Sequence, residues 1–209
     1  MKVLLLEHPR SVSPERCNDI ANTPLASCLL SGYVAGVLQG DGHEVDIIEG
    51  YLEGLSYREI EEQVKERAPG LLAVNMVYHW QGDQEIFSFL QKLKEERIVP
   101  YIAVYGYYPT FACEEILKNC AAVDAVVLGE PELTFSELAA FLSRGEEPRD
   151  LPGLVVRDRA GVCRRRRELI EDLDSIPFPV RTEAMMRISE VNLQGSRACY
   201  GGCTFCYIN

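Results

Sequence analysis

The chain has 209 residues, of which 47% are hydrophobic and 25% are charged, so it carries enough apolar side chains for a sizeable core. Its 32 acidic residues outnumber its 21 basic ones and give a net charge of −11. Because a protein binds nucleic acid through a basic face that neutralises phosphates, this balance argues against a nucleic-acid partner.

Five short apolar runs alternate with helical patterns over residues 1–145. Each run is continuous and mostly β-branched, as in strands buried on both faces of a parallel sheet. The expected strands cover Lys2–Leu6, Val45–Ile48, Leu71–Val77, Tyr101–Tyr105 and Ala125–Leu128. The first run is too short for a signal peptide or a membrane span, so we expect a cytoplasmic protein with no membrane partner.

Helices with recognisable ends separate these strands. Each begins at a capping residue or a proline. The expected helices run from Thr23-Pro24 to Gly40, from the capping box Ser56-x-x-Glu59, from Asp83, from Thr110, and over Pro131–Leu142. This alternation predicts an α/β domain over residues 1–145, with a doubly wound, five-stranded parallel sheet of the Rossmann-like kind.

The pattern changes after Gly145. Two short strands around Arg159-Ala-Gly161 predict a β-hairpin, whose basic run at residues 164–167 we expect at a solvated strand edge. The segment Asp172–Pro179 holds two prolines in three residues, which is typical of an extended linker. We therefore expect a hairpin and linker over residues 146–187, followed by a strand at 188–193 that opens a further domain over residues 188–209.

Three cysteines near the end of the chain have the spacing C-x3-C-x2-C: Cys199, Cys203 and Cys206. Clustered thiolates in a cytosolic protein indicate an iron–sulfur or a zinc site. A structural zinc site usually needs a fourth ligand from a second cysteine pair, which does not follow here. Three thiolates can instead hold three irons of a [4Fe–4S] cluster and leave the fourth open, and Gly201 and Gly202 would let the backbone approach it.

The segment Gly195-Ser-Arg-Ala-Cys199-Tyr-Gly-Gly-Cys203-Thr-Phe-Cys206-Tyr resembles the cluster loop of radical S-adenosylmethionine (SAM) enzymes. The resemblance implies that Cys199, Cys203 and Cys206 ligate a [4Fe–4S] cluster whose open iron chelates SAM, with Phe205 at the aromatic position of the loop. It also implies a reducing partner such as flavodoxin or ferredoxin. Residues 188–209 would then be the first strand and cluster loop of a truncated partial barrel.

Weaker motifs upstream resemble the cobalamin-binding domain and linker of cobalamin-dependent radical SAM enzymes. These motifs are Gly42–Val45, Tyr105–Thr110, Leu128–Leu133, Leu151–Leu154 and Leu173–Pro179. The resemblance implies that the parent protein is a methyltransferase that uses methylcobalamin and a 5′-deoxyadenosyl radical on an unactivated carbon. Two alternatives stay open: a radical SAM enzyme that forms or rearranges rings, and a non-catalytic cobalamin carrier or sensor.

A receiver-like regulatory module is a further alternative for a five-stranded α/β domain. A receiver needs paired acidic residues after its first strand and an aspartate after its third. Here the first strand ends in Glu7-His8-Pro9 and the third in Asn75-Met76, which argues against that class.

Ligands of open α/β sheets bind beyond the carboxyl ends of the strands, so the candidate cobalamin contacts are the residues that follow them. They are His8, Tyr78, His79, Trp80, Tyr105, Gly106, Tyr107, Tyr108, Gly129 and Glu130. Glu130 and Glu132 also begin the fifth helix, where the helix dipole alone accounts for carboxylates.

His43 needs a separate interpretation, because Asp41-Gly-His43 mimics the Asp-x-His pattern of cobalamin methyltransferases and mutases. It precedes the second strand, at the amino edge of the sheet, so we interpret it as an ordinary turn residue. His8 and His79 lie at the carboxyl edge. By resemblance to the radical SAM branch, we expect cobalamin to bind without a histidine below its cobalt.

Overall fold

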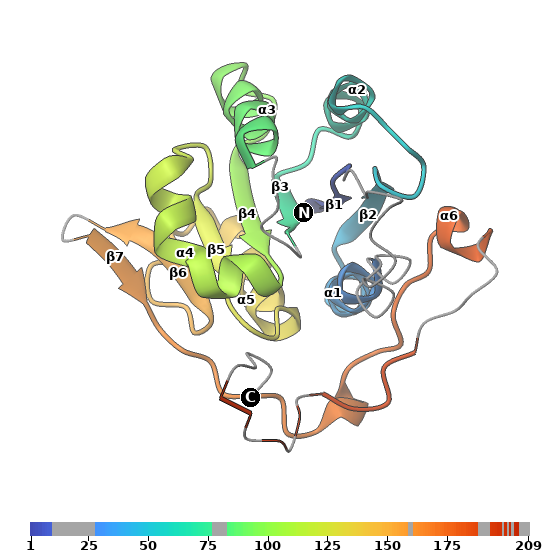
Figure 1. Cartoon of the computed structure of the whole chain (residues 1–209), viewed down its shortest axis with the longest axis vertical. Helices are drawn as coiled ribbons and strands as arrows, with labels where there is room; N and C mark the ends of the chain where they lie inside the picture. The colour runs from blue at the N-terminus through green and yellow to red at the C-terminus, as the bar shows by residue number, and fades with distance from the viewer. Residues whose placement is uncertain are drawn as a thin grey trace.

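The computed structural model describes residues 1–9, 28–76, 83–158, 161–187, 193–197, 199, 201, 203 and 204. Seven strands in these ranges form one sheet in the order β2-β1-β3-β4-β5-β6-β7 (Figure 1). The strands are β1 (Lys2–Glu7), β2 (Glu44–Glu49), β3 (Leu71–Asn75), β4 (Tyr101–Tyr105), β5 (Ala125–Val127), β6 (Leu154–Asp158) and β7 (Gly161–Arg164). The helices are α1 (Cys28–Gly40), α2 (Tyr57–Arg67), α3 (Asp83–Glu95), α4 (Tyr107–Asn119), α5 (Glu132–Ser143), a 3-10 turn η3 (Leu173–Ser175) and α6 (Glu183–Met186).

The first five strands are parallel, as expected, and each lies within two residues of its predicted bounds. Two differences concern the helices. The expected start of α1 at Thr23-Pro24 lies outside the described residues, and α4 begins at Tyr107 rather than Thr110 because a first turn joins it across a kink at Ala112. The expected strand at 188–193 is also mostly outside the described residues.

Each face of the sheet carries its own hydrophobic core, because alternate residues of a strand point to opposite faces. Leu4 and Leu6 of β1 belong to the core beneath α2, α3 and α4. Val3 and Leu5 belong to the core beneath α1 and α5. Figure 1 shows the two layers of helices on either side of the sheet. The chain is therefore doubly wound, and none of its described helices has the length and apolar character to cross a membrane.

The hairpin after Gly145 is part of the sheet, which corrects the expectation that it lies outside a five-stranded domain. Strand β6 pairs antiparallel with β5, with Val155 opposite Val126. Arg157 reinforces this pairing: its guanidinium donates to the carbonyl oxygens of Leu117 at 2.7 Å and Cys120 at 2.6 Å. These carbonyls end α4 and lack partners within the helix, so the hairpin completes the hydrogen bonding of the domain.

The basic run at residues 164–167 is only partly at a solvated edge. Arg164 and Arg165 are exposed, whereas the Arg167 side chain is 14% exposed. Arg167 donates to the Thr134 hydroxyl at 2.9 Å and to the Glu137 carboxylate at 2.5 Å, so it fastens the segment after β7 to α5.

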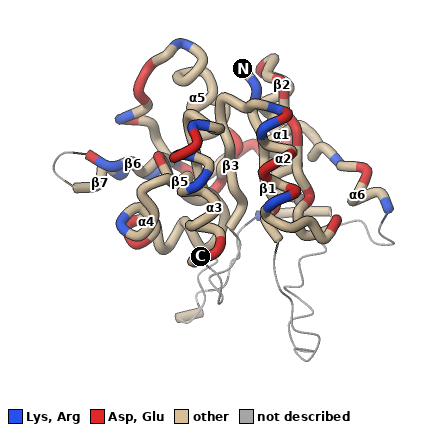
Figure 2. Tube along the Cα trace, turned by 90° about the horizontal axis from the view of Figure 1, so that it is seen from above, with Lys and Arg blue, Asp and Glu red and all other residues tan. Residues whose placement is uncertain are grey.

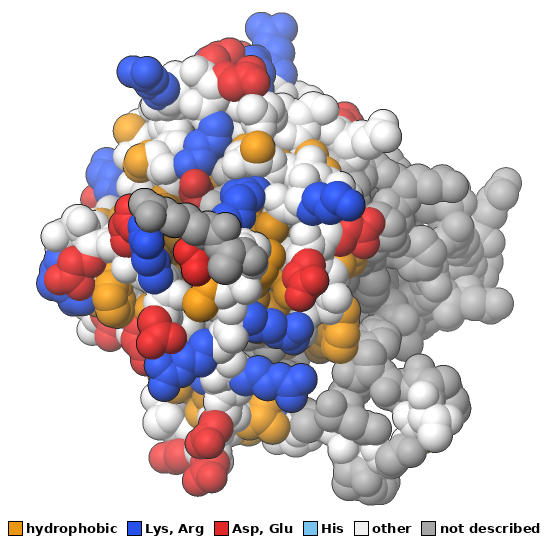
Figure 3. Space-filling view, turned by 90° about the vertical axis from the view of Figure 1, so that its left-hand side faces the viewer, with side chains coloured by type: hydrophobic (Ala, Val, Ile, Leu, Met, Phe, Trp, Pro, Cys, Tyr) orange, Lys and Arg blue, Asp and Glu red, His pale blue; other side chains and the backbone are white. Residues whose placement is uncertain are grey.

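Acidic and basic residues are interspersed over the described surface. Figure 2 shows both signs along the same helices, and Figure 3 shows them side by side on the face that lies at the left of Figure 1. Neither view presents a large patch of one sign.

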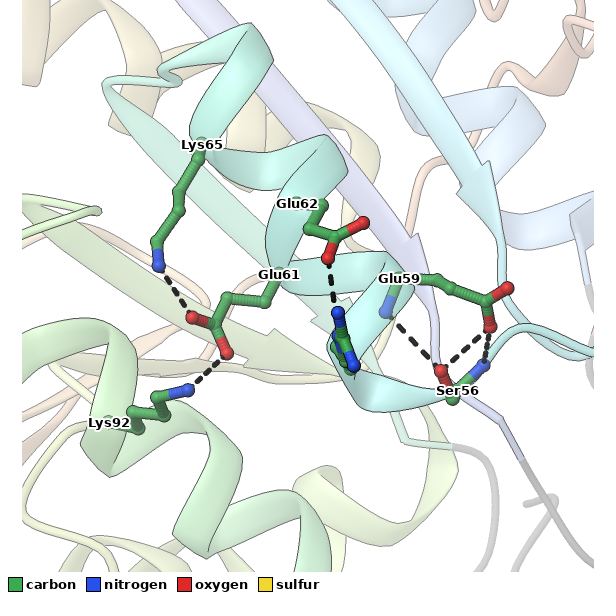
Figure 4. Close-up of polar contacts among 7 residues, drawn as sticks. Ser56, Glu59, Glu61, Glu62, Lys65 and Lys92 are labelled. Atoms are coloured by element: carbon green, nitrogen blue, oxygen red, sulfur yellow. Dashed lines mark hydrogen bonds and ion pairs between the residues drawn. The ribbon is translucent and has the colours of Figure 1, made fainter.

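The start of α2 follows its sequence signal. Glu59 donates its backbone N–H to the Ser56 hydroxyl, and the Glu59 carboxylate accepts from the Ser56 N–H at 2.8 Å, which completes the expected capping box (Figure 4). Further along α2, Glu61 accepts from Lys65 at 2.6 Å and from Lys92 of α3 at 2.5 Å. Both lysines are about half exposed, at 47% and 50%, so solvent screens this bridge and it contributes little to stability.

The segment after the hairpin lies against α1 instead of hanging free. The Val180 N–H donates to the Gly32 carbonyl oxygen at 3.0 Å, although a helical carbonyl normally bonds within its helix. A Cβ at Gly32 would lie 2.6 Å from the Val180 oxygen, and one at Gly36 would lie 3.0 Å from the Phe178 oxygen. The two glycines, one helical turn apart, therefore form a track that admits the backbone of residues 178–180.

Replacing Gly32 with alanine tests this track. The new methyl group would push residues 178–180 away, and overpacking of this kind outweighs the gain in helix propensity. We expect the free energy of unfolding to fall by about 1–2 kcal/mol and protease cleavage within residues 176–182 to accelerate. Gly40→Ala in the same helix is the control, because a Cβ there meets nothing within 4 Å. Equal behaviour of the two variants would contradict the docking.

Candidate functional site

The winding of the sheet reverses at β1, and this makes its carboxyl edge the expected position of a ligand site. Strand β1 pairs with β2 on one side and β3 on the other, so the chain leaves β1 in one direction to reach β2 and then crosses back past β1 to reach β3. In sheets of this order, 2-1-3-4-5, ligands bind beyond the carboxyl ends of the strands at that switch point. The residues that follow β1, β3, β4 and β5 are therefore the candidate site.

A buried polar network lies beneath this edge. Glu7, Ser31, Asn75 and Tyr105 are all fully buried. The Ser31 hydroxyl donates to Glu7 Oε1 and lies 2.6 Å from the Tyr105 hydroxyl, while Asn75 Nδ2 donates to the same Glu7 oxygen at 2.7 Å. Buried polar groups are costly unless hydrogen-bonded, so this network fixes the ends of β1, β3 and β4 relative to α1.

Two predicted contacts, Tyr105 and Gly106, have a structural role in this arrangement. The Tyr105 ring is 0% exposed and packs edge-on against Phe135, with 5.0 Å between ring centroids. Gly106 has φ +112°, and a Cβ there would lie 2.6 Å from Asn75 Oδ1. Glycine is thus needed at position 106 because the turn after β4 lies directly against the end of β3.

The remaining residues after β4 and β5 lie closer to the surface. Tyr107 is 52% exposed in the first turn of α4, whereas Tyr108 is partly buried against the core beneath α2–α4. Thr110 links the two turns, because its hydroxyl donates to the Gly106 carbonyl at 2.8 Å and accepts from the Gly129 N–H at 3.0 Å. Gly129 is exposed with φ +61°, and a Cβ there would meet nothing within 4 Å.

The histidines separate as the sequence predicts. His43 lies at the amino edge, where its Nδ1 is 3.1 Å from the Met1 amino group. His8 follows β1 at the carboxyl edge, with Nδ1 2.9 Å from the Pro9 carbonyl oxygen and 3.5 Å from the Tyr57 hydroxyl. His8 therefore lies between the Pro9 carbonyl oxygen and Tyr57, the first residue of α2.

Five predicted site residues lie outside the described residues: Tyr78, His79, Trp80, Phe205 and Cys206. The other two cysteines, Cys199 and Cys203, are exposed. Both thiols lie beside Gly201, where an added Cβ would be 3.4 Å from Cys199 Sγ and 3.8 Å from Cys203 Sγ. The Gly201 N–H also donates to Cys199 Sγ at 3.3 Å. The two thiols therefore lie on the same side of Gly201, each at van der Waals distance from the position of its missing Cβ.

The acidic pair at the start of α5 has a partner that the sequence did not reveal. Arg197, two residues before Cys199, donates to Glu130 at 3.1 Å and to Glu132 at 2.6 Å. Glu130 also accepts from the Ile170 N–H at 2.6 Å. The helix dipole is therefore not the only reason for these carboxylates. They also join the carboxyl edge of the sheet to the segment that carries Cys199 and Cys203 (the cysteine segment).

The described residues hold no group of three side chains placed to bind a metal ion, which agrees with the position of Cys206 outside them. Three residues of this site were not among the predicted contacts: Ser31 and Asn75 of the buried network, and Arg197, which pairs with Glu130 and Glu132. Ser31 sits inside a helix and bonds across 24 and 74 residues, so no local pattern could have identified it.

Comparison with known proteins identifies the domain. Residues 31–139, slightly more than half of the chain, match the family described as B12 binding domain. An uncharacterized methyltransferase from Pyrococcus horikoshii is 28% identical over 99% of this chain and 45% of its own length. An anaerobic magnesium-protoporphyrin IX monomethyl ester cyclase from Synechocystis is 28% identical over 99% of this chain and 42% of its own length. The chain thus spans less than half of either relative.

Solved structures share the fold. The cobalamin-dependent SAM radical enzyme OxsB with aqua-cobalamin and SAM bound matches 85% of this chain and 24% of its own, with a TM-score of 0.68 and 19% identity. The radical SAM methyltransferase TsrM from Kitasatospora setae, with cobalamin and a [4Fe–4S] cluster bound, matches 86% of this chain and 31% of its own, with a TM-score of 0.63 and 17% identity. The chain belongs to the B12-binding domain family, and its sequence and structure are similar to those of cobalamin-dependent radical SAM enzymes.

Proposed function

We propose that this chain is the cobalamin-binding portion, together with the cluster loop, of a radical SAM enzyme that transfers a methyl group. The match of residues 31–139 to the B12 binding domain carries the proposal, because it falls on a sheet with a switch point, where open α/β sheets generally bind their ligands. A relative named as a cytidylyl-2-hydroxyethylphosphonate methyltransferase, from Streptomyces wedmorensis, is 24% identical over 84% of the chain and supports methyl transfer.

The residues at the carboxyl edge fit a large planar cofactor. Gly129 leaves open space at the exposed turn after β5, and the half-exposed Tyr107 lies in the first turn of α4. We propose that these two residues contact cobalamin, with the unplaced aromatics Tyr78 and Trp80 completing an apolar floor. Cobalamin supplies a transferable methyl group when bound, and the protein's part is to position it and exclude water.

The cysteine segment fits an iron–sulfur cluster. Cys199 and Cys203 converge beside Gly201, and the Gly201 N–H bonds to Cys199 Sγ, as hydrogen bonds to cluster sulfurs commonly do. We propose that Cys199, Cys203 and Cys206 hold a [4Fe–4S] cluster with one open iron for SAM. When bound, such a cluster would supply one electron to SAM. A partner such as flavodoxin or ferredoxin would deliver that electron to the cluster.

A second candidate function is ring formation. The Synechocystis cyclase and the Pyrococcus methyltransferase are each 28% identical to this chain over 99% of this chain's length. A non-catalytic cobalamin carrier remains the third. Transfer of a labelled methyl group from SAM by the parent enzyme separates the first function from the other two, since neither of them leaves the label on a product.

Cobalamin binding at the Gly129 turn can be tested with a matched pair of variants. Gly129→Leu and Gly145→Leu each place a side chain at a left-handed position with open space, φ +61° and +72°, at opposite ends of α5. Each costs roughly 1–2 kcal/mol of backbone strain. We expect hydroxocobalamin, titrated by absorbance, to bind Gly129→Leu at least about tenfold more weakly, a difference of about 1.4 kcal/mol. Equal affinity for both variants would remove Gly129 from the site.

The histidine-free lower face of cobalamin is tested with His8→Ala and His79→Ala. Because the resemblance to the radical SAM branch implies no histidine below the cobalt, we expect both variants to bind hydroxocobalamin with the affinity of the native chain. The electron paramagnetic resonance spectrum of the bound cob(II)alamin should show no nitrogen splitting from an axial imidazole. A histidine ligand is established instead if the native spectrum carries that splitting and one variant loses it.

Cluster ligation is tested by anaerobic reconstitution with iron and sulfide. We expect the native chain to take up about four irons, with broad visible absorption, and Cys199→Ser or Cys203→Ser to abolish it, because a thiolate is the required ligand. Cys163→Ser is the control: Cys163 lies on β7, and its thiol bonds to the Arg149 carbonyl oxygen at 3.4 Å. Iron uptake that survives both loop variants would count against the proposed site.

A further inference from the structure

We propose that Arg197 is a positioning residue, which clamps the cysteine segment to the carboxyl edge of the sheet and holds the two candidate cofactor loops as one unit. The inference rests on the proposed function for the identity of the cofactors. The clamp itself is a set of contacts within this chain and can be tested without either cofactor.

The clamp joins one cation to two carboxylates on a single turn. Arg197 Nη1 donates to Glu130 Oε1 at 3.1 Å, and Nη2 donates to Glu132 Oε1 at 2.6 Å. The Arg197 and Glu130 side chains are 14% and 15% exposed, and Glu132 is fully buried. A guanidinium offers two parallel donors in fixed geometry, so this arrangement fixes both the distance and the orientation of the segment.

Glu132 makes the contact obligatory. Its Oε2 atom is buried without a hydrogen-bond partner among the described residues. Burial raises the pKa of Glu132, and the charge of Arg197 offsets this only in part. A buried carboxylate that loses its cation is strongly destabilised. The fold therefore favours the docked position of Arg197 over one in solvent.

Two further contacts hold Arg197 and Glu130 in position. The Arg197 guanidinium lies over the Tyr33 ring of α1, 5.3 Å from its centroid, a distance at which a cation and an aromatic face attract. Glu130 uses its second oxygen to accept from the Ile170 N–H at 2.6 Å. The clamp thus gathers α1, the turn after β5, the segment after β7 and the cysteine segment at one point.

A continuous path of contacts connects the clamp to the edge after β4. The Gly106 carbonyl accepts from Thr110, and the Thr110 hydroxyl accepts from the N–H of Gly129, the neighbour of Glu130. At the other end, Arg197 lies two residues before Cys199. The candidate cobalamin turn at Gly129 and the candidate cluster ligand Cys199 are therefore tied to opposite sides of one ion pair.

Limited proteolysis of the 209-residue chain tests the clamp. We expect Arg197→Gln to speed cleavage within residues 193–204 by about tenfold or more, which corresponds to about 1.4 kcal/mol of local opening. Arg197→Lys should restore part of the protection, because it keeps the charge but loses the paired donors. A merely space-filling role would not distinguish lysine from glutamine in this way.

Arg187→Gln is the matched control. Arg187 also joins the C-terminal segment to the domain, through Glu53 at 3.6 Å, but it is 69% exposed, so its loss should leave residues 193–204 unchanged. If Arg197→Gln also speeds cleavage in β1 and β3, that variant has destabilised the whole domain. Glu130→Gln then takes its place, because Glu130 lies at the edge of the clamp, and it should speed cleavage within residues 193–204 alone. Unchanged cleavage within residues 193–204 overturns the proposal. Failure of the proposed function is read separately, as a native chain that binds no hydroxocobalamin.

Discussion

The reversal of winding at β1 is the constraint on which the rest of the structure depends. Because β1 lies between β2 and β3, α1 packs on one face of the sheet while α2, α3 and α4 pack on the other. The chain ends of β1 and β3 then meet with no crossover above them. A carboxylate, an amide and a hydroxyl can be buried there only as a mutually bonded set, and Glu7, Asn75 and Ser31 form that set.

The elements that the sequence predicted well are those with local causes. The strands were visible as buried apolar runs, and α2 as a capping box whose bonds the structure contains. The pairing of β6 with β5 was not predictable, because it depends on Arg157 reaching the end of α4 some forty residues earlier. The docking of Val180 on Gly32 has the same character: a glycine inside a helix reveals a close approach but not the segment that makes it.

The candidate site divides in the same way. Its location followed from the general rule for open sheets, and its cysteines from their spacing. The roles of individual residues did not follow, since an aromatic side chain after a strand can point inward or outward. Tyr105 points inward and bonds to Ser31, whereas Tyr107, two residues later, is half exposed. Glu130 and Glu132 looked complete as helix-start carboxylates, and only the distant Arg197 shows that they have a second role.

The segment from β7 to Cys199 behaves as a strap rather than a linker, because three kinds of contact fasten it at intervals. Val180 bonds to the α1 backbone, Thr182 donates to the buried Glu49 at 3.1 Å, and Arg197 pairs with the start of α5. All three anchors lie in elements that surround the switch point. Because the segment is already fastened at these three residues, it loses little further conformational entropy when a ligand bridges the two loops. This is the energetic advantage of preorganisation. Arg197, two residues before Cys199, is thus fastened to the start of α5 by contacts within the chain itself.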